Sequence, residues 1–106
     1  MPASQRILIV LLLCASCAAQ GEITPQRQQE LLYLLHQDCG ACHGITLKGG
    51  LGPALLPRRL AAYSQAFITQ TILKGRPGTP MPPWSPFMTE QEAHWLAGRL
   101  QAGVTP

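Results

Sequence analysis

The chain has 106 residues, of which 46% are hydrophobic and 12% are charged, and its formal net charge is +3. A chain of this length holds a single domain, and the hydrophobic fraction excludes a disordered chain. The charge is small and the basic residues form no run, so the composition gives no sign of a nucleic-acid-binding surface.

The first 19 residues have the composition of an export signal. Arg6 is followed by an unbroken apolar run at residues 7–13, and small residues follow to Ala19. This is the order of regions in a secretory signal peptide, and the apolar run is shorter than the ~20 residues of a membrane-spanning helix. We therefore expect a cleaved signal peptide at residues 1–19 and an exported mature domain at residues 20–106.

Cys14 and Cys17 also have Cys-x-x-Cys spacing, but they lie within this export segment. The first interpretation is that both are removed with the signal peptide. The alternative is lipidation of Cys17 after cleavage at Ser16, although Cys14 stands where leucine is usually preferred. Attachment to a membrane is therefore expected only if Cys17 is lipidated. Removal of the segment leaves Cys39 and Cys42, and we expect no disulfide.

The mature chain opens with the signals of a helix start. Thr24 is a suitable N-cap and Pro25 suits the first helical position. The sequence from there to about Asp38 predicts a helix. Its apolar face contains Leu31, Leu34 and Leu35, widened by Leu32 and Tyr33.

The sequence Cys39-Gly40-Ala41-Cys42-His43 follows this helix. Two cysteines separated by two residues and followed at once by histidine are typical of a c-type haem attachment site. Each thiol adds across one vinyl group of a single haem, and the next residue is then held beneath the iron, where an imidazole nitrogen ligates it. The pattern predicts one covalent haem c anchored by Cys39 and Cys42, with His43 as an axial ligand.

A Cys-x-x-Cys pair has two other common uses, as a redox dithiol and as half of a zinc site. A zinc site requires a second pair of ligands, and no cysteine follows Cys42. A thioredoxin-like dithiol requires a βαβ setting, and no strand pattern surrounds this motif. The sequence therefore favours haem.

A long segment at residues 44–62 shows little periodicity, which predicts a loop. Its glycines and prolines include Gly49, Gly50, Gly52, Pro53 and Pro57. A loop of this length is uncommon in a compact domain, but a haem is a large apolar plate against whose edge such a loop packs. We expect a backbone carbonyl near Pro53 to accept the second N–H of His43 and fix its ring. The alternative is that Pro53 is a plain loop proline.

A second helix is predicted to begin after Ser64, which is a suitable N-cap, and to run to Lys74. Gly75 then ends it. The residues expected to face inward are Phe67, Ile68, Thr71 and Ile72.

Residues 76–86 hold half of the ten prolines of the chain, so this segment is neither helix nor central strand. This segment, residues 76–86, is stiff and contains Met81, and we call it the methionine segment. Methionine is more often core filler than ligand, but the flanking prolines and the distance from His43 favour Met81 as the second axial ligand. Met88 is expected to pack beneath the last helix. His36 is expected on the solvent side of the first helix.

The last helix has the clearest start, because Thr89 and Glu92 form a capping box. Its predicted apolar face contains Ala93, Leu96, Ala97 and Leu100. Trp95 borders that face, His94 is expected to be exposed, and Gly103 ends the helix. Three helices and no convincing strand predict a small all-α fold.

Ligation by histidine and methionine would leave the iron no open site for oxygen, peroxide or nitrite. A thioether ligand also favours ferrous iron and raises the reduction potential. The sequence therefore predicts an electron carrier and no enzyme. A peroxidase or gas sensor that displaces Met81 is an alternative from another class, which ready carbon monoxide binding by the native ferrous protein would support.

Three segments resemble class I cytochromes c, and the resemblance covers essentially the whole mature chain. They are Cys39-Gly40-Ala41-Cys42-His43-Gly44, Leu51-Gly52-Pro53-Ala54-Leu55 and the methionine segment. More narrowly, Thr46-Leu47-Lys48-Gly49-Gly50-Leu51-Gly52-Pro53 and Gly78-Thr79-Pro80-Met81-Pro82-Pro83-Trp84 are similar to the cytochrome c-55X group. Members of that group are small periplasmic monohaem proteins associated with haem-d nitrite reductase in denitrifying bacteria.

The resemblance implies a small class I cytochrome c fold, with about three main helices and long loops around one covalently bound haem. It implies Cys39 and Cys42 as haem anchors, His43 and Met81 as axial ligands, and a periplasmic location. Two functions follow from it. The protein donates electrons to haem-d nitrite reductase, or it exchanges electrons with an enzyme of haem d maturation.

We expect redox partner proteins, no nucleic acid and a monomer. The contact surface would be the haem edge and the loop residues around it, such as Ala54, Leu55, Pro82 and Pro83. Encounters of this kind are small and transient. The basic residues Arg58, Arg59, Lys74 and Arg76 are too few in the sequence to define a docking partner.

Overall fold

A computed structural model describes residues 21–104 of the chain. The described residues form helices and no strand, as predicted for an all-α fold. In chain order the elements are α2 (Pro25–Leu34), the π-helical segment η2 (Leu35–Cys39), α3 (Gly40–His43), α4 (Pro57–Leu60), α5 (Gln65–Lys74) and α6 (Glu90–Ala102). No helix in this part of the chain is both long enough and apolar enough to cross a membrane. The predicted signal peptide, with Cys14 and Cys17, lies outside the described residues.

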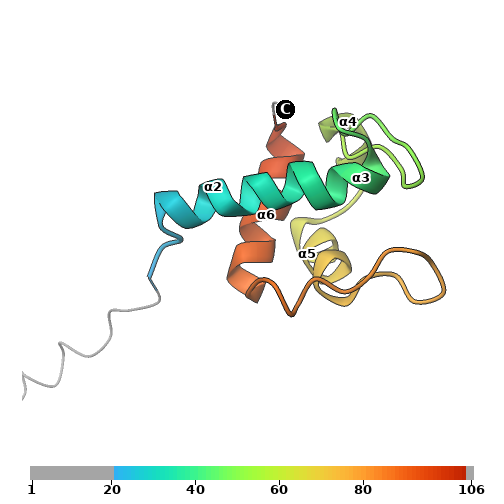
Figure 1. Ribbon diagram of the computed structural model, residues 1–106. Coiled ribbons are helices and arrows are strands. Elements are labelled where there is room, and N and C mark those ends of the chain that lie inside the picture. Colours follow the sequence, from blue (N-terminus) through green and yellow to red (C-terminus); the bar gives the residue numbers. More distant parts are fainter. Residues whose placement is uncertain (1–20, 105–106) are drawn as a thin grey trace, which may run out of the picture.

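The elements α2, η2 and α3 form one continuous helical run (Figure 1). Thr24 caps its start as predicted, because its hydroxyl oxygen accepts a hydrogen bond from the backbone N–H of Arg27 at 3.2 Å. The predicted end near Asp38 is wrong. The run continues through His43 and ends at Gly44, whose φ of 92° no continuing helix adopts.

The π-helical turn η2 lies just before the cysteine motif. Across it the N–H of Gly40 donates to the carbonyl oxygen of Leu35, a wider spacing than that of an α-helix. Leu35 itself is buried in the core, at 1% exposure. The motif therefore occupies the last turns of the helix, directly beyond a residue that is anchored in the core.

The two later helices begin and end where the sequence predicts. Ser64 accepts a hydrogen bond from the Phe67 N–H and α5 ends at Gly75. Thr89 and Glu92 form both bonds of a capping box at the start of α6. These boundaries depend on side chains within three residues of the helix end, so local sequence is enough to set them.

The core lies where α2 crosses α6 and where α5 and α4 pack against α6 (Figure 1). The four predicted apolar residues of α6 are all buried. The core residues are Leu31, Leu35, Leu47, Leu60, Ile68, Met88, Ala93, Leu96, Ala97 and Leu100. Burial of Met88 agrees with its predicted place beneath the last helix, and His94 is exposed as expected.

Some predicted packing is wrong. Tyr33 does not widen the buried face of the first helix, because its side chain is 69% exposed. Phe67 is 55% exposed, whereas Thr69 of the same helix is buried. Residues 44–62 are not a plain loop either, since they contain α4 and the buried Leu47, which adopts a φ of 59°.

The N-termini of α2 and α6 are joined by an interaction that the sequence analysis did not identify. Arg27 pairs with the Glu92 carboxylate and also donates to the carbonyl oxygen of Phe87 at 2.9 Å. The hydrogen bond from Arg27, together with that from the backbone N–H of Thr89, holds the pKa of Glu92 below its ordinary value of 4.5. Glu92 therefore serves both the helix cap and the crossing of the two helices.

Candidate functional site

A large, mostly apolar cavity of about 690 Å³ opens at the end of the molecule where the cysteine motif lies. Its volume is within the range of about 300–1000 Å³ that is usual for cofactor and ligand sites. Its walls come from the η2–α3 turn, α4, α5, the loop at residues 51–55 and the methionine segment. Most of the lining is apolar, with Leu35, Leu51, Leu55, Leu60, Ile68, Ile72, Trp84, Leu96 and Leu100 among its residues.

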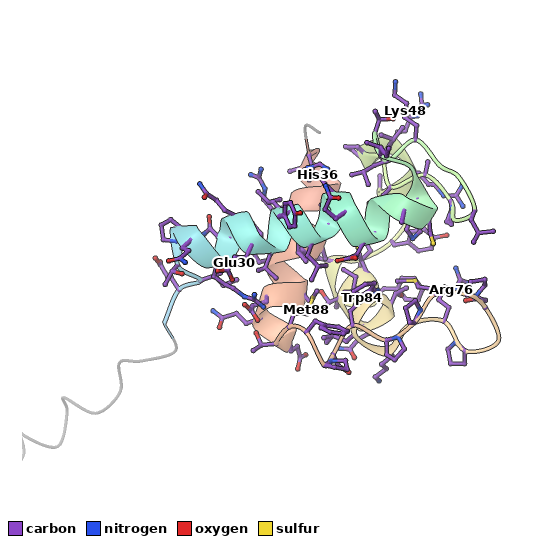
Figure 2. All side chains as sticks on the ribbon, in the orientation of Figure 1. Glu30, His36, Lys48, Arg76, Trp84 and Met88 are labelled. Atoms are coloured by element: carbon purple, nitrogen blue, oxygen red, sulfur yellow. The ribbon has the colours of Figure 1, made fainter. Side chains whose placement is uncertain are left out.

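All five residues that the sequence singled out for the haem line this one cavity. They are Cys39, Cys42, His43, Pro53 and Met81. Met88 lines it too, from its buried position in the core, whereas His36 does not. In Figure 2, Trp84 and Met88 lie below α2, and Arg76 lies farther along the methionine segment.

The imidazole of His43 is oriented by one backbone group. Its Nδ1 lies 2.6 Å from the carbonyl oxygen of Pro53, the contact expected near this residue. A carbonyl oxygen only accepts, so Nδ1 carries the proton and donates, and the lone pair of the ring is on Nε2. This is the tautomer that a metal-ligating histidine requires.

The loop that carries Pro53 is fastened to the motif itself. The N–H of Gly52 donates to the carbonyl oxygen of Cys42 at 2.8 Å, and the N–H of Gly49 donates to that of His43 at the same distance. These carbonyls end the helix and have no partner within it. The end of the helical run thus positions the loop, and the loop in turn positions the His43 ring.

The two cysteines of the motif are free in the chain and half-buried. Burial raises the pKa of the Cys39 thiol to about 11, and the neighbouring Asp38 carboxylate adds to the effect. Cys39 is therefore a neutral thiol near pH 7. It therefore lacks the activated thiolate of a redox dithiol.

The methionine segment is held against the end of α5 by backbone hydrogen bonds. The N–H of Trp84 donates to Ile72 at 3.0 Å and that of Ser85 to Leu73 at 3.2 Å. At the other end of the segment, the N–H of Arg76 donates to the carbonyl oxygen of Met81 at 3.2 Å. Both sides of Met81 are therefore restrained, as expected of a stiff segment.

Gly75 allows the methionine segment to approach α5 this closely. Its φ is 64°, and a Cβ placed on it would lie 2.6 Å from the carbonyl carbon of Pro82 and 2.7 Å from the carbonyl oxygen of Met81. No larger residue fits without displacing the segment. The glycine that ends the helix thus also determines where Met81 lies.

Several lining residues were not identified as site residues. The stacked rings of Tyr63 and Phe67 have centroids 5.2 Å apart and border the opening. Arg59 and Arg76 are the basic residues of the lining. The spacing of Phe67 along α5 predicts an inward-facing residue. In the structure it faces the cavity and not the protein core, and spacing alone cannot distinguish these two positions.

The cavity has the donor set that a haem c requires. Two thiols stand one helical turn apart, an imidazole presents Nε2, and a thioether lies on another wall of the same apolar space. The guanidinium groups of Arg59 and Arg76 supply positive charge suited to two propionates. The residues present therefore fit the group that the motif predicts.

Comparison with known proteins identifies the family. The domain model described as cytochrome C oxidase, cbb3-type, subunit III matches residues 26–98. The chain is 44% identical over 105 residues to cytochrome c55X of Pseudomonas aeruginosa, covering 95% of this chain and 88% of that protein. It is 42% identical over 95 residues to cytochrome c55X of Paracoccus denitrificans, covering 90% and 92%.

Two solved structures share this fold at substantial identity. One is a c-type cytochrome NirC, with a TM-score of 0.76, 48% identity, and coverage of 78% of this chain and 99% of that chain. The other is the dihydro-heme d1 dehydrogenase NirN in complex with DHE, with a TM-score of 0.61, 36% identity, and coverage of 71% of this chain and 16% of that chain. The chain therefore belongs to the cytochrome c55X group of class I c-type cytochromes, and its cofactor is a covalently bound haem c.

Proposed function

We propose that this protein is a periplasmic one-electron carrier whose haem iron is ligated by His43 and Met81. In this proposal residues 1–19 are a cleaved signal peptide and residues 20–106 form a monomeric monohaem domain. The observation that carries the proposal is the single cavity lined by the cysteine pair, the oriented imidazole and the restrained thioether.

The proposal assigns each site residue one task. Cys39 and Cys42 hold the haem through thioethers, and His43 presents Nε2 while the Pro53 carbonyl keeps its ring from turning. Met81 approaches from the opposite loop. A bound haem would supply a one-electron couple, and ligation of its iron by both His43 and Met81 would leave no coordination position for a substrate.

Rigid walls suit this task. The backbone bonds that hold the Pro53 loop and the methionine segment keep both ligand-bearing segments in place. Ligands that do not move between oxidation states keep reorganisation small, and an apolar lining that excludes water influences the reduction potential. These features favour electron transfer over bond-making chemistry.

For the partner, we propose haem-d nitrite reductase as the acceptor of the electron. This assignment follows from the resemblance to the cytochrome c-55X group. A second candidate is an enzyme of haem d maturation. It is favoured by the similarity to the dihydro-heme d1 dehydrogenase, part of which has the same fold as this chain.

Stopped-flow mixing of the reduced protein with oxidised haem-d nitrite reductase tests this proposal. Fast, saturable oxidation that sustains nitrite turnover is the expected result. Negligible transfer from a protein that small reagents oxidise readily would reject the donor role. In that case the same experiment with a dihydro-haem d1 dehydrogenase tests the second candidate.

A separate measurement tests the ligation. The native ferrous protein is expected to bind carbon monoxide slowly and incompletely, because Met81 must first leave the iron. Ready binding at neutral pH would contradict the carrier proposal and favour a gas sensor or a peroxidase.

A further inference from the structure

Among residues 21–104, basic side chains gather at the cavity end of the molecule and acidic side chains gather near the start of α2. We infer that the cavity end is a cationic docking surface whose redox partner is a protein with an acidic patch around its own electron-transfer site. This inference rests on the proposed carrier function and adds the chemistry of the partner. It differs from the expectation, based on sequence alone, that the basic residues are too few to define a docking partner.

The basic side chains at the cavity end come from three separate segments. We define the cationic rim as Lys48, Arg58, Arg59 and Arg76, all of which are exposed. Arg59 and Arg76 line the cavity, and Arg58 lies beside Arg59 on α4. Lys48 is carried by the loop that follows the haem motif, and Figure 2 shows Lys48 and Arg76 at the same end of the molecule.

Acidic side chains gather at the opposite end. Glu30 and Glu92 both contact Arg27 near the start of α2. Glu90 begins α6 beside Gln70, and Glu22 follows Gly21, whose carbonyl oxygen accepts from Gln91 of α6. Figure 2 shows Glu30 far from Lys48 and Arg76. Lys74 and Arg99 belong to neither group.

The haem does not cancel the cationic rim. Asp38 is the acidic residue that lines the cavity, and haem adds two propionates. The four basic side chains of the rim outnumber these three carboxylates. The opposite end has four carboxylates and one basic side chain, the guanidinium of Arg27. The carboxylates belong to Glu22, Glu30, Glu90 and Glu92. The charge difference between the two ends therefore persists in the holoprotein.

The surface inside the rim is apolar. Leu51 lines the cavity and is 77% exposed. Pro82 is exposed on the facing methionine segment. An apolar centre with a charged border is the usual anatomy of a protein–protein interface. Charge of one sign on that border steers a partner of the opposite sign and raises the association rate.

Small redox reagents test the surface without any assumption about the physiological partner. The reduced protein gives one electron to hexacyanoferrate(III), which becomes hexacyanoferrate(II). We expect this rate to fall as salt is added, because attraction to the rim is screened. With the cationic oxidant tris(phenanthroline)cobalt(III), the rate should rise with salt.

Two double variants with equal net charge locate the effect. Lys48→Gln/Arg58→Gln removes two charges from rim residues that do not line the cavity. Gln26→Glu/Gln29→Glu adds two negative charges at exposed positions near the start of α2. At low salt the first should slow oxidation by hexacyanoferrate(III) about threefold to tenfold, and the second should change it little. Equal slowing by both would overturn the inference, because net charge alone would then explain the rates.

The same variants are then mixed with haem-d nitrite reductase. A loss confined to the rim variant, and abolished by high salt, supports an acidic docking patch on the partner. If the wild-type protein transfers no electrons to the reductase, the proposed donor role is rejected. The experiment with small reagents still tests whether the cationic rim attracts anions. The inference would be overturned if the protein adsorbs to vesicles of anionic lipid and the rim variant transfers electrons to the reductase as fast as the wild type. The target of the rim would then be a membrane.

Discussion

Gly52 lies directly against the imidazole of His43. A Cβ on Gly52 would stand 2.8 Å from both Cε1 and Nδ1 of the ring, a separation that atoms in folded proteins do not tolerate. The next residue, Pro53, supplies the carbonyl that accepts from Nδ1. Two adjacent residues thus determine the position of the ring, one by its absent side chain and the other by its backbone oxygen.

The first prediction concerns this contact. Gly52→Ala should push the ring away from Pro53 and lower the stability of the holoprotein by about 1–3 kcal/mol, the usual cost of overpacking. It should also shift the reduction potential, because the donation of His43 to iron depends on the bond at Nδ1. Thermal unfolding and redox titration measure both effects.

Gly40→Ala is the matched control for Gly52→Ala. Gly40 lies in α3, where the same added methyl would meet its nearest atoms at 3.7 Å, an ordinary contact distance. Alanine is also the better helix residue, so this variant should be as stable as the wild type or slightly more so. Equal losses in both variants would show that the Gly52–His43 contact is not the cause.

The second prediction separates the two methionines. Met81→Ala should abolish the sulfur-to-iron charge-transfer band of the ferric protein and lower the reduction potential. Met88→Ala should keep the band but destabilise the fold by about 2–5 kcal/mol, because Met88 is only 6% exposed and packs in the core. Absorption spectra and urea unfolding of both variants make the comparison. Loss of the band in Met88→Ala alone would reverse the assignment.

The third prediction is that the stability of the protein depends on pH because of the Glu92 carboxylate. The pKa of this carboxyl is lower in the folded chain than its ordinary value of 4.5, chiefly because Arg27 donates to it. Its contribution is therefore complete above that value and is lost as the pH falls through the folded pKa. Glu92→Gln keeps an amide suited to the capping box and should cost roughly 1 kcal/mol at pH 7, a modest figure because Arg27 is one-third exposed.

Urea unfolding of the ferric holoprotein between pH 7 and pH 3 measures this effect. The difference between wild type and Glu92→Gln should shrink as the pH falls below 4.5. Glu30→Gln removes the other carboxylate that contacts Arg27, at a more exposed position, and should cost less at pH 7. A constant difference between wild type and Glu92→Gln at every pH would contradict the assigned role of the ion pair.

The fourth prediction concerns the chain without its haem. A domain of this size has a marginal core, and here the core borders an apolar cavity of about 690 Å³ that water would have to fill. Cys39→Ser/Cys42→Ser prevents covalent attachment, and this variant should be largely unfolded. Circular dichroism checks this, since a helical spectrum with a cooperative melting transition would contradict it.

The boundaries of α5 and α6 were predictable because they are local. Ser64, Thr89 and Glu92 satisfy backbone groups within three residues of themselves, so a short stretch of sequence contains the whole interaction. The haem motif was predictable for the same reason. The fold class follows once these boundaries and the apolar face of α6 are known.

Features that depend on the packing of distant segments were not predictable. The π-helical turn at Leu35–Cys39 leaves no distinctive residue pattern, and burial of Leu47 at a positive φ depends on where the loop meets the core. Phe67 has the spacing of a core residue, but the cavity lies on that side of α5. The cationic rim joins residues 48, 58, 59 and 76, whose proximity only the folded chain creates.

The uninterrupted run from α2 to α3 has a consequence for the order of assembly. Leu35 is buried in the core and Cys39 follows it within one π-helical turn, so completing the core also partly covers the Cys39 sulfur. The half-buried Cys39 is a neutral thiol, because its pKa is raised to about 11, and is a poor nucleophile. Thioether formation should therefore precede helix docking during biogenesis, with an open, unpacked polypeptide as the substrate of the haem-attaching machinery.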